Sequence, residues 1–368
     1  MSTGFFWDER CFWHAGGNYA FTMHIGGLVQ PLAAGGIPEN PETKRRLKNL
    51  MDVTGLTAEL AMQGAPAATR EMLERVHPVS YLDAFKAMSD AGGGEIGHHA
   101  PFASGGYEIA AVSAGLAVGA VDAVASGTLD NAYALSRPPG HHCEADGPAG
   151  FCLLANIAIA IEAARAKGLV KRVAVVDWDV HHGNGTEAIF YDRDEVLTLS
   201  MHQDGNYPIT SGALKDRGRG AGEGYNINLP MHAGSGHNAY LHAMDRVVIP
   251  ALEAYKPDMI IVACGYDAAV VDPLARMQAM AETFGVMTTR IKDAAERLCD
   301  GKLVLVHEGG YSEVYVPFCG HATLTALSGS RIEAPDPMAP GLKPRQPSPT
   351  FDAFLRQSID DMALQLEL

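Results

Sequence analysis

Short apolar runs recur along the middle and last thirds of the chain, and segments with a helical pattern lie between several of them. Each run is hydrophobic at nearly every position, which is typical of a parallel β-strand buried on both faces. The runs cover residues 132–135, 173–177, 196–200, 225–229, 259–263 and 303–307. The helical patterns between them cover residues 156–166, 238–255 and 282–298. This alternation predicts an α/β fold with a mostly parallel central sheet flanked by helices.

The N-terminal third has a weaker pattern. Residues 1–36 are rich in glycine and aromatic residues with little periodicity, so we expect loops there. Further helices are expected over residues 41–50, 68–76, 80–88 and 107–125. We find no internal repeat and no break in composition, which favours a single domain over residues 1–368.

The C-terminal segment combines a proline-rich stretch with an amphipathic one. Residues 331–349 are rich in proline and are interpreted as a linker. An apolar stripe then predicts a helix over residues 350–366. The stripe consists of Phe351, Phe354, Leu355, Ile359, Met362 and Leu366. We expect this face to dock on the main body, and a dimer contact is the alternative.

The composition of the chain indicates which partners and which compartment to expect. The chain of 368 residues carries 28 basic and 43 acidic residues, so its net charge is −15. This charge repels phosphate backbones, so we expect no nucleic-acid partner and a cationic or neutral substrate. The six cysteines form no Cys-x-x-Cys pair, which fits a reducing compartment. We find no signal peptide and no apolar stretch approaching membrane-spanning length, so we expect a cytoplasmic protein without a membrane partner.

Polar clusters follow five of the predicted strands directly. They lie at residues 137–142 (Arg-Pro-Pro-Gly-His-His), 177–185 (Asp-Trp-Asp-Val-His-His-Gly-Asn-Gly), 200–202 (Ser-Met-His), 264–267 (Cys-Gly-Tyr-Asp) and 307–311 (His-Glu-Gly-Gly-Tyr). The carboxyl ends of parallel strands form one edge of a sheet, where ligands bind. We therefore expect the five clusters to converge on one site.

The cluster at residues 177–185 has the spacing of a metal site. Asp179 and His181 are two positions apart at a strand end, so both side chains can face one ion. Zinc accepts carboxylate and imidazole ligands, and a catalytic zinc keeps one position open. Asp267 is the best candidate for a third ligand. An Asp₂His site with an open position would be a hydrolytic metal centre.

The neighbouring clusters supply groups for proton transfer. His141 and His142 offer a general base and a general acid with ordinary pKa values near neutrality. Tyr311 follows two glycines and can present its hydroxyl to a developing oxyanion. His202 and His307 are weaker candidates for a direct role. The cysteines are interpreted as structural. So are seven other histidines: His14, His24, His77, His232, His237, His242 and His321.

Together these motifs resemble the histone deacetylase superfamily, in its class II and prokaryotic histone deacetylase-like amidohydrolase branch. Besides the clusters above, the matching segments are 150–152 (Gly-Phe-Cys), 265–268 (Gly-Tyr-Asp-Ala) and 272–274 (Asp-Pro-Leu). The matches follow the family order from about residue 130 to 320, with weaker similarity in the N-terminal third. The resemblance implies the arginase/deacetylase fold, a single α/β domain whose central parallel sheet has about eight strands.

The resemblance also implies two metal ions. The zinc ligands would be Asp179, His181 and Asp267. A structural potassium ion would be held by the side chains of Asp177, Asp179 and Ser200 and by the backbone oxygens of His181 and Met201. This cation would hold the geometry of the carboxylates and reduce their mutual repulsion. Asp177 would also hold His141.

Roles in binding and catalysis follow from the same resemblance. His142 would be the main proton shuttle, and Tyr311 would donate a hydrogen bond to the scissile carbonyl. The Gly150 carbonyl would accept the N–H of the substrate amide. Phe151 would form one wall of an acyl-lysine tunnel.

The sequence departs from the wider family at several positions. This chain has Asn184 at a position where class I members have Asp and class II members have Asn. His142 therefore lacks a charged partner, and its pKa should be lower. Tyr207 stands where the family usually has a Phe in the tunnel wall. The family often has an Asp at the rim near residues 98–99, where this chain has two histidines, so we expect weaker gripping of a peptide backbone.

These residues favour one function over three others. The expected function is a zinc-dependent deacylase acting on acylated lysine in peptides or proteins. An arginase-like ureohydrolase needs a carboxylate at Gly265, and a silent acyl-lysine binding module would lack Tyr311. Acetylpolyamine amidohydrolases, whose substrates are small acylated amines, carry an acidic gatekeeper where this chain has Leu274. The sequence leaves a homo-oligomer, either a dimer or a tetramer, open.

Overall fold

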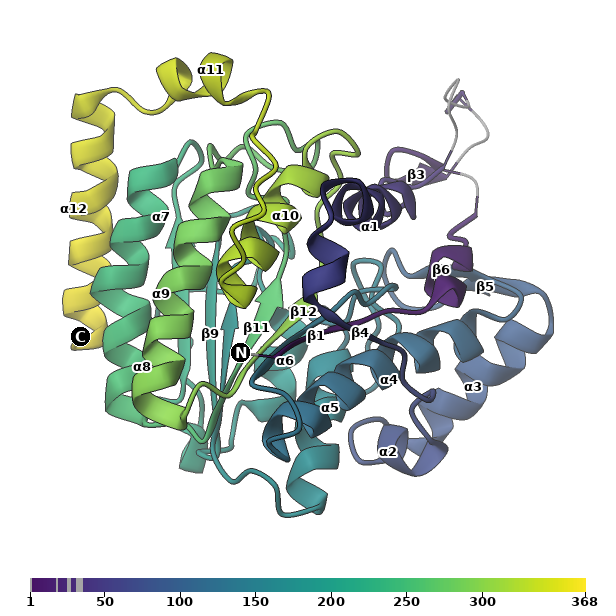
Figure 1. Cartoon of the computed structure of the whole chain (residues 1–368). Coiled ribbons are helices and arrows are strands. Elements are labelled where there is room, and N and C mark those ends of the chain that lie inside the picture. The colour runs from purple at the N-terminus through teal and green to yellow at the C-terminus, as the bar shows by residue number, and fades with distance from the viewer. Residues whose placement is uncertain (1, 18, 25–27, 31–35) are drawn as a thin grey trace.

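A central sheet of eight parallel strands runs through the molecule (Figure 1). The computed structural model describes residues 2–17, 19–24, 28–30 and 36–368. The strand order in the sheet is β10-β9-β8-β11-β12-β7-β1-β4. Two small antiparallel hairpins lie outside it: β2 (Tyr19–Ala20) with β3 (Met23–His24), and β5 (Gly93–Glu95) with β6 (Pro101–Ala103).

All six strands predicted from the apolar runs are present. They are β7 (Asn131–Ala134), β8 (Val173–Asp177), β9 (Val196–Gln203), β10 (Asn226–Met231), β11 (Met259–Cys264) and β12 (Leu303–His307). Every residue of β8, β11 and β12 is buried. This burial on both faces is the reason that these strands read as continuous apolar runs.

Two strands of the sheet were not predicted. β1 (Thr3–Phe6) lies between β7 and β4 (Ala61–Gln63), so the expectation of loops throughout residues 1–36 was wrong. β1 contains Gly4, where a Cβ atom would collide with the side chain of Leu129. β4 is a half-buried edge strand of three residues. Such short segments are below the length at which alternation can be recognised.

Helices cover both faces of the sheet (Figure 1). On one face lie α1 (Glu42–Thr54), α7 (His237–Ala243), α8 (Ile249–Tyr255), α9 (Ala281–Cys299) and α10 (Val316–Ser328). On the other lie α2 (Arg70–Glu74), α3 (Val79–Asp90), α4 (Gly106–Ala125), α5 (Asn156–Ala166) and α6 (Asn184–Phe190). A π-helical turn, Met244–Val248, joins α7 to α8, so the helix predicted over residues 238–255 is continuous but irregular. Helices α6 and α10 had not been predicted.

Helix α4 corrects an expectation about apolar segments. It is 20 residues long and, by length and composition alone, apolar enough to cross a membrane. Within the structure, 67% of the most apolar stretch of this helix is buried, and the helix packs against α5 and β7. Its composition therefore matches a core helix that is covered on most sides.

The proline-rich segment at residues 331–349 is held against the body. It contains α11 (Ala339–Leu342) and a 3₁₀ turn, Lys343–Arg345. The side chain of Gln346 accepts a hydrogen bond from His237 N and donates one to Gln278 O, both at 2.9 Å. Helix α12 (Pro349–Leu366) then packs on α7 and β10. Four residues of its apolar stripe are buried, whereas Phe351 and Phe354 are exposed.

Candidate active site

The carboxyl ends of five adjacent strands, β9, β8, β11, β12 and β7, open onto one cavity of about 390 Å³. Seven of the predicted site residues line it: His142, Gly150, Phe151, His181, Tyr207, Leu274 and Tyr311. The structure therefore brings together side chains that are up to 169 positions apart in the sequence.

Three buried side chains form a compact group of ligand atoms, and one of them, His181, lines this cavity. Asp179, His181 and Asp267 each offer one atom, and these atoms lie within 4.8 Å of one another. His181 Nδ1 is 3.1 Å from Asp179 Oδ1 and 3.1 Å from Asp267 Oδ2. One imidazole nitrogen and two carboxylate oxygens are a donor set that zinc accepts.

The electrostatics of this group also fit a cation. No lysine or arginine in the described part of the chain lies within 4.0 Å of either carboxylate; their ion-pair partners are histidines. Burial and the charge of Asp179 raise the pKa of Asp267 to about 6. The carboxylates of Asp179 and Asp267 offer oxygens within 4.8 Å of each other, and two buried carboxylates this close repel each other unless a cation lies between them.

Two glycines leave room for the carboxylates. A Cβ atom on Gly265 would collide with Asp179 Oδ2, and one on Gly309 would lie 2.6 Å from the same atom. The Gly309 position is also 3.0 Å from the Tyr311 hydroxyl oxygen. Both glycines therefore border the space in which a metal ion would sit. Gly309 N donates a hydrogen bond to Asp179 Oδ2 at 2.8 Å.

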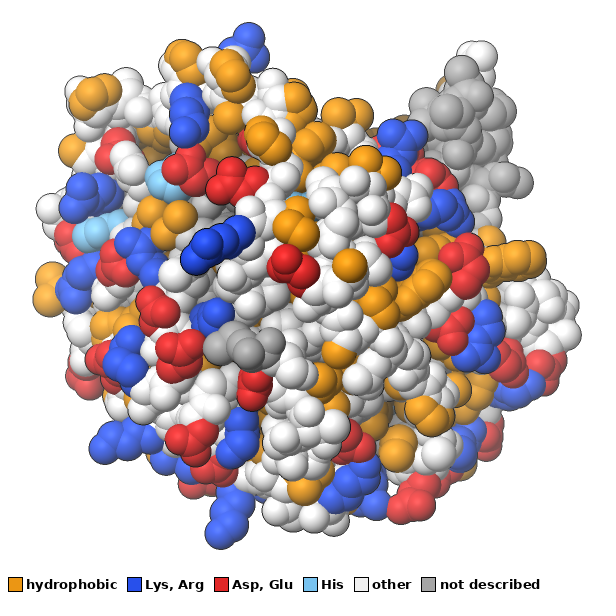
Figure 2. Space-filling view, viewed as in Figure 1, with side chains coloured by type: hydrophobic (Ala, Val, Ile, Leu, Met, Phe, Trp, Pro, Cys, Tyr) orange, Lys and Arg blue, Asp and Glu red, His pale blue; other side chains and the backbone are white. Residues whose placement is uncertain are grey.

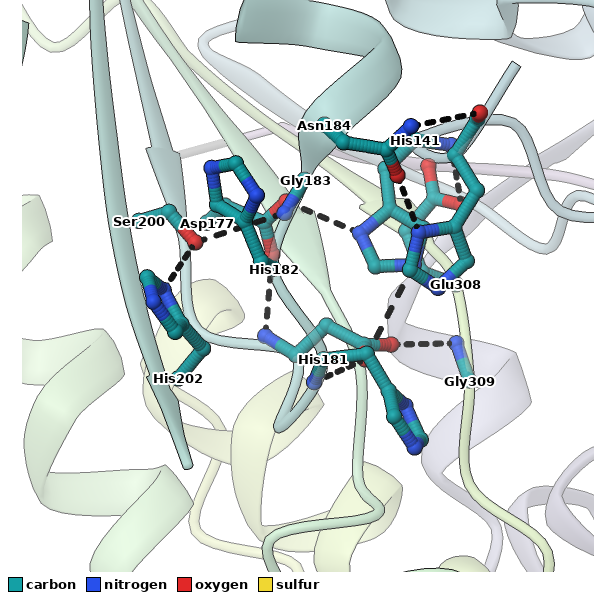
Figure 3. A network of polar contacts seen from close by, with 12 residues as sticks. His141, Asp177, His181, His182, Gly183, Asn184, Ser200, His202, Glu308 and Gly309 are labelled. Atoms are coloured by element: carbon teal, nitrogen blue, oxygen red, sulfur yellow. Dashed lines mark hydrogen bonds and ion pairs between the residues drawn. The ribbon is translucent and has the colours of Figure 1, made fainter. Parts of the chain in front are cut away.

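His141 is held by a carboxylate from β8 (Figure 3). Its Nδ1 is 2.9 Å from Asp177 Oδ2, and both side chains are buried. Burial alone would lower the pKa of His141, but the carboxylates of Asp179 and Asp177 raise it well above its ordinary value. His141 is therefore the charged member of the histidine pair.

His142 is the neutral member of the pair. Its Nδ1 is 2.8 Å from Asn184 Oδ1, and the Asn184 amide nitrogen is 3.2 Å from Glu144 Oε1. Burial and the neighbouring charges of His141 and His181 lower the pKa of His142 well below its ordinary value. The neutral imidazole thus donates its Nδ1–H to Asn184 and leaves Nε2 as an acceptor.

Tyr311 is placed by its backbone. Gly310 has φ of +123°, a conformation that favours glycine, and Tyr311 N donates to Asp272 Oδ2 at 2.8 Å. The Tyr311 ring is 5.8 Å from that of Phe151 in an edge-to-face arrangement. Burial and the charges of Asp267 and Asp179 raise the pKa of Tyr311 well above its ordinary value, so its hydroxyl keeps its proton.

The walls of the cavity combine aromatic rings with a tight backbone turn. Gly150 and Phe151 have φ of +51° and +68°, and a Cβ atom on Gly150 would collide with the His142 ring. The Tyr207 ring is 5.0 Å from that of His142 and nearly perpendicular to it. The hydroxyl of Tyr207 is 3.1 Å from His98 Nδ1. The histidines at residues 98–99 therefore belong to the rim of the same cavity.

Three of the predicted potassium ligands lie close together. Asp177 and Ser200 are partners in the β8–β9 register and line a second cavity of about 10 Å³. Asp179 N donates a hydrogen bond to Asp177 Oδ1 at 3.0 Å. Ser200 Oγ is 2.9 Å from His202 Nδ1 and accepts a long hydrogen bond from Gly183 N at 3.4 Å (Figure 3).

Two carboxylates at the site had not been assigned a role from the sequence. Asp272 accepts hydrogen bonds from Tyr311 N and Leu274 N, both at 2.8 Å. Burial and the charge of Asp267 raise the pKa of Asp272 to about 8. Glu308 Oε2 accepts from the backbone N–H groups of residues 140 and 141 at 2.7 and 3.1 Å, and burial raises the pKa of Glu308 to about 7. Both residues lie in motifs of the resemblance, but each also binds the backbone of a segment that is distant in the sequence.

Comparison with known proteins decides the family. The model of the histone deacetylase domain matches residues 37–327. The chain belongs to the histone deacetylase family. The resemblance identified from its motifs is confirmed. Members of the histone deacetylase family are in general zinc-dependent, and the group formed by Asp179, His181 and Asp267 fits such an ion.

Individual relatives within the histone deacetylase family support this assignment over the full chain. A histone deacetylase-like amidohydrolase from Pseudomonas aeruginosa is 56% identical over 366 residues, covering 100% of this chain and 96% of the relative. A probable deacetylase from Archaeoglobus fulgidus is 35% identical, covering 88% and 92%. The crystal structure of the HDA15 HD domain has a TM-score of 0.83 at 30% identity and covers 99% of this chain and 96% of that chain. The predicted α/β fold is confirmed, and the protein is a hydrolase of the histone deacetylase-like amidohydrolase kind.

Proposed function

We propose that the protein is a zinc-dependent deacylase that hydrolyses the amide of Nε-acyl-lysine in peptides or proteins. The observation that carries the proposal is a buried group of ligand atoms next to the cavity. Asp179, His181 and Asp267 form this group, and His181, His142 and Tyr311 line the cavity itself. A metal group with a neutral base and a protonated phenol beside it suits hydrolysis of an uncharged amide.

In this proposal, Asp179, His181 and Asp267 would hold zinc, and the ion would supply Lewis acidity for the hydrolysis. His142 accepts the proton of the attacking water at Nε2, since Nδ1 is bonded to Asn184 Oδ1 at 2.8 Å. It later returns a proton to the leaving amine. His141, charged and paired with Asp177, holds positive charge beside this transfer. Each such proton-transfer group contributes on the order of 10²–10⁴ in rate.

Tyr311 donates its O–H to the carbonyl oxygen as negative charge develops there. Its raised pKa keeps the proton in place for that hydrogen bond. A single oxyanion donor of this kind contributes on the order of 10²–10³. The Gly150 carbonyl accepts the substrate N–H, and Phe151 and Tyr207 enclose the lysine stem.

The wall at Leu274 supports lysine over a polyamine. Leu274 lines the cavity and is part of an apolar cluster with Phe151 and Tyr311. An aliphatic side chain at this position offers no partner to the second amine of a polyamine. A structural potassium ion near Asp177 and Ser200 is part of the proposal as well, because both residues line the second cavity.

Turnover of four substrates tests the proposal. Acetyl-lysine and trifluoroacetyl-lysine peptides are compared with N-acetylputrescine and N-acetylspermidine, before and after chelation and with zinc restored. We expect turnover of both peptides that is lost on chelation and returns with zinc. Turnover of the polyamines alone would contradict the lysine assignment, and chelator-resistant turnover would contradict the metal assignment.

A further inference from the structure

The mouth of the cavity differs in charge from the rest of the protein. The whole chain carries a net charge of −15. Yet no aspartate or glutamate is among the described residues that line the cavity. The ionisable nitrogen side chains that line it are His99, His142, His181 and Arg276. Of these, only Arg276 carries a permanent charge.

The backbone of Arg276 is fixed at this position. Arg276 N donates to Gln203 Oε1 at 2.7 Å, and Arg276 O accepts from Gly234 N at 2.7 Å. Gln203 itself lines the cavity. The loop that carries Arg276 is therefore tied both to the end of β9 and to the segment after β10.

The guanidinium group of Arg276 has unused donors. NH1 is 2.6 Å from the carbonyl oxygen of Ala275 and 3.4 Å from that of Pro273. Within the described part of the chain, no carboxylate lies within 4.0 Å of it. A guanidinium has five N–H donors in a planar fork that matches a carboxylate. NH2 and Nε remain available at the edge of the cavity.

An acidic residue beside His99, Glu95, is already paired. Glu95 Oε2 is 2.7 Å from His24 Nε2 and accepts a hydrogen bond from the Tyr19 hydroxyl at 2.8 Å. Glu95 does not line the cavity. Among the described residues that line the cavity, an incoming substrate therefore meets a positive side chain, Arg276, and no carboxylate.

We propose that Arg276 binds a carboxylate that the substrate carries next to its acyl-lysine. This inference rests on the proposed function, because the acyl group and the lysine stem must fill the tunnel. The substrate main chain then lies at the mouth, where a neighbouring carboxylate can reach the guanidinium. The source of the carboxylate is an acidic side chain or the end of the peptide. A cationic tail would meet Arg276 as a like charge.

Peptide kinetics at low ionic strength test this subsite. Acetyl-lysine peptides with blocked ends carry Glu, Ala or Lys on both sides of the acetyl-lysine, and a fourth Ala peptide has a free C-terminal carboxylate. For the native holoenzyme we expect kcat/KM to be higher for the Glu peptide than for the Lys peptide by about threefold or more, as exposed ion pairs give. The ratio should shrink in 0.5 M salt, because exposed charges are screened.

Two substitutions assign the effect to Arg276. In Arg276→Gln the ratio of kcat/KM for the Glu and Lys peptides should approach one, and in Arg276→Glu it should reverse. Arg219→Gln is the matched control, because it removes the same charge from an exposed arginine that does not line the cavity. Its ratio should equal that of the native enzyme. A gain for the free C-terminal carboxylate over the blocked Ala peptide identifies the chain end as a source.

The possible failures are distinguishable. If no acetyl-lysine peptide is hydrolysed by the zinc-loaded enzyme, the proposed function fails and this inference with it. If all peptides are hydrolysed with equal kcat/KM, the function stands and the Arg276 subsite is overturned. A preference for Glu that Arg276→Gln leaves unchanged would also overturn it, since another group would then bind the carboxylate.

Discussion

At the scale of single residues, the proposed metal site depends on two positions that contribute no side chain. Gly265 and Gly309 border Asp179 so closely that a methyl group would enter the space of its carboxylate. Three ligands in the right sequence positions are therefore not sufficient. The neighbouring backbone positions must also lack side chains, and a search of the sequence for ligand residues alone does not reveal this requirement.

We predict that Gly265→Ala abolishes zinc binding while all three ligands remain. The added Cβ atom would collide with Asp179 Oδ2 and move it away from His181 and Asp267. The measurement is zinc content by atomic absorption after dialysis, with a thermal melt to establish that the variant is folded. Gly285→Ala on α9 is the control, because its Cβ would only touch Ala322 at 3.4 Å. Full zinc content in a folded Gly265→Ala protein would contradict the proposed ligand set.

A second prediction concerns Asp272, which we expect to act through Tyr311. Removing the carboxylate in Asp272→Ala frees the Tyr311 backbone, and kcat should fall by about tenfold to a hundredfold, as misplacement of a catalytic group does. Asp272→Asn keeps an acceptor oxygen and should retain most of the activity. Tyr311→Phe should lose about 10²–10³. Steady-state kinetics on an acetyl-lysine peptide measure these effects.

The double variant separates positioning from general destabilisation. If Asp272 works through the Tyr311 hydroxyl, Asp272→Ala should add little to Tyr311→Phe. Multiplicative losses in the double variant would show that the two residues act independently.

The sequence predicted the residues that we propose to bind metal and transfer protons better than the residues that place them. Asp179, His181, His142 and Tyr311 follow buried strands in types suited to metal binding and proton transfer, so their convergence could be deduced from a parallel sheet. Asp272 acts on the backbone of a residue 39 positions away. Such a contact depends on tertiary geometry and leaves no local pattern.

At the scale of elements, the strands that could be predicted from the sequence are the long and fully buried ones. Strands β8, β11 and β12 could be predicted because every residue in them is buried, so each is a continuous apolar run. Strand β1 could not, because four residues with a glycine resemble a loop. The edge strand β4 contributes only three half-buried residues. Helix α12 shows the same limit, since its periodicity included Phe351 and Phe354, which the structure leaves exposed.

We predict that the burial of α12 contributes strongly to stability. Leu355→Ala removes a side chain that is 1% exposed and should cost about 2–5 kcal/mol in the free energy of unfolding. Leu364→Ala, on the same helix but 69% exposed, should change it by less than about 0.5 kcal/mol. Chemical denaturation of both variants measures the difference. Equal effects would mean that α12 is not docked as the structure places it.

At the scale of the whole molecule, buried neutral histidines couple folding to pH. His14, His77 and His202 are buried, and burial lowers their pKa values to about 3, about 4 and about 3. His77 shows why the neutral form is kept: Nδ1 is 2.7 Å from Ala145 O, and Nε2 accepts from Ala155 N at 3.1 Å. Protonation would remove that acceptor.

We predict that the contribution of these three histidines to stability falls as the pH falls from about 6.5 towards 4. In this range the unfolded chain binds protons that the folded histidines do not bind, so this contribution to the free energy of unfolding rises with pH. The raised pKa values of Asp267, Asp272 and Glu308 act in the opposite direction, so the histidine contribution is measured as a difference between variants. For His77 alone the difference amounts to about 3 kcal/mol, from roughly 2.5 pKa units. Denaturation curves at several pH values measure the slope. His77→Gln, which keeps a donor and an acceptor but does not titrate, should flatten it, and an unchanged slope would contradict the assignment.

The place of β12 in the sheet has a consequence for biosynthesis. β12 (Leu303–His307) is the strand that joins the half made of β10, β9, β8 and β11 to the half made of β7, β1 and β4. A ribosome adds roughly 5–20 residues per second. Strand β1 is therefore complete between about 15 and 60 seconds before β12 emerges to close the sheet. Because the candidate site draws residues from both halves, a nascent chain acquires it only near the end of translation. Premature termination would leave two exposed sheet edges for chaperones to cover.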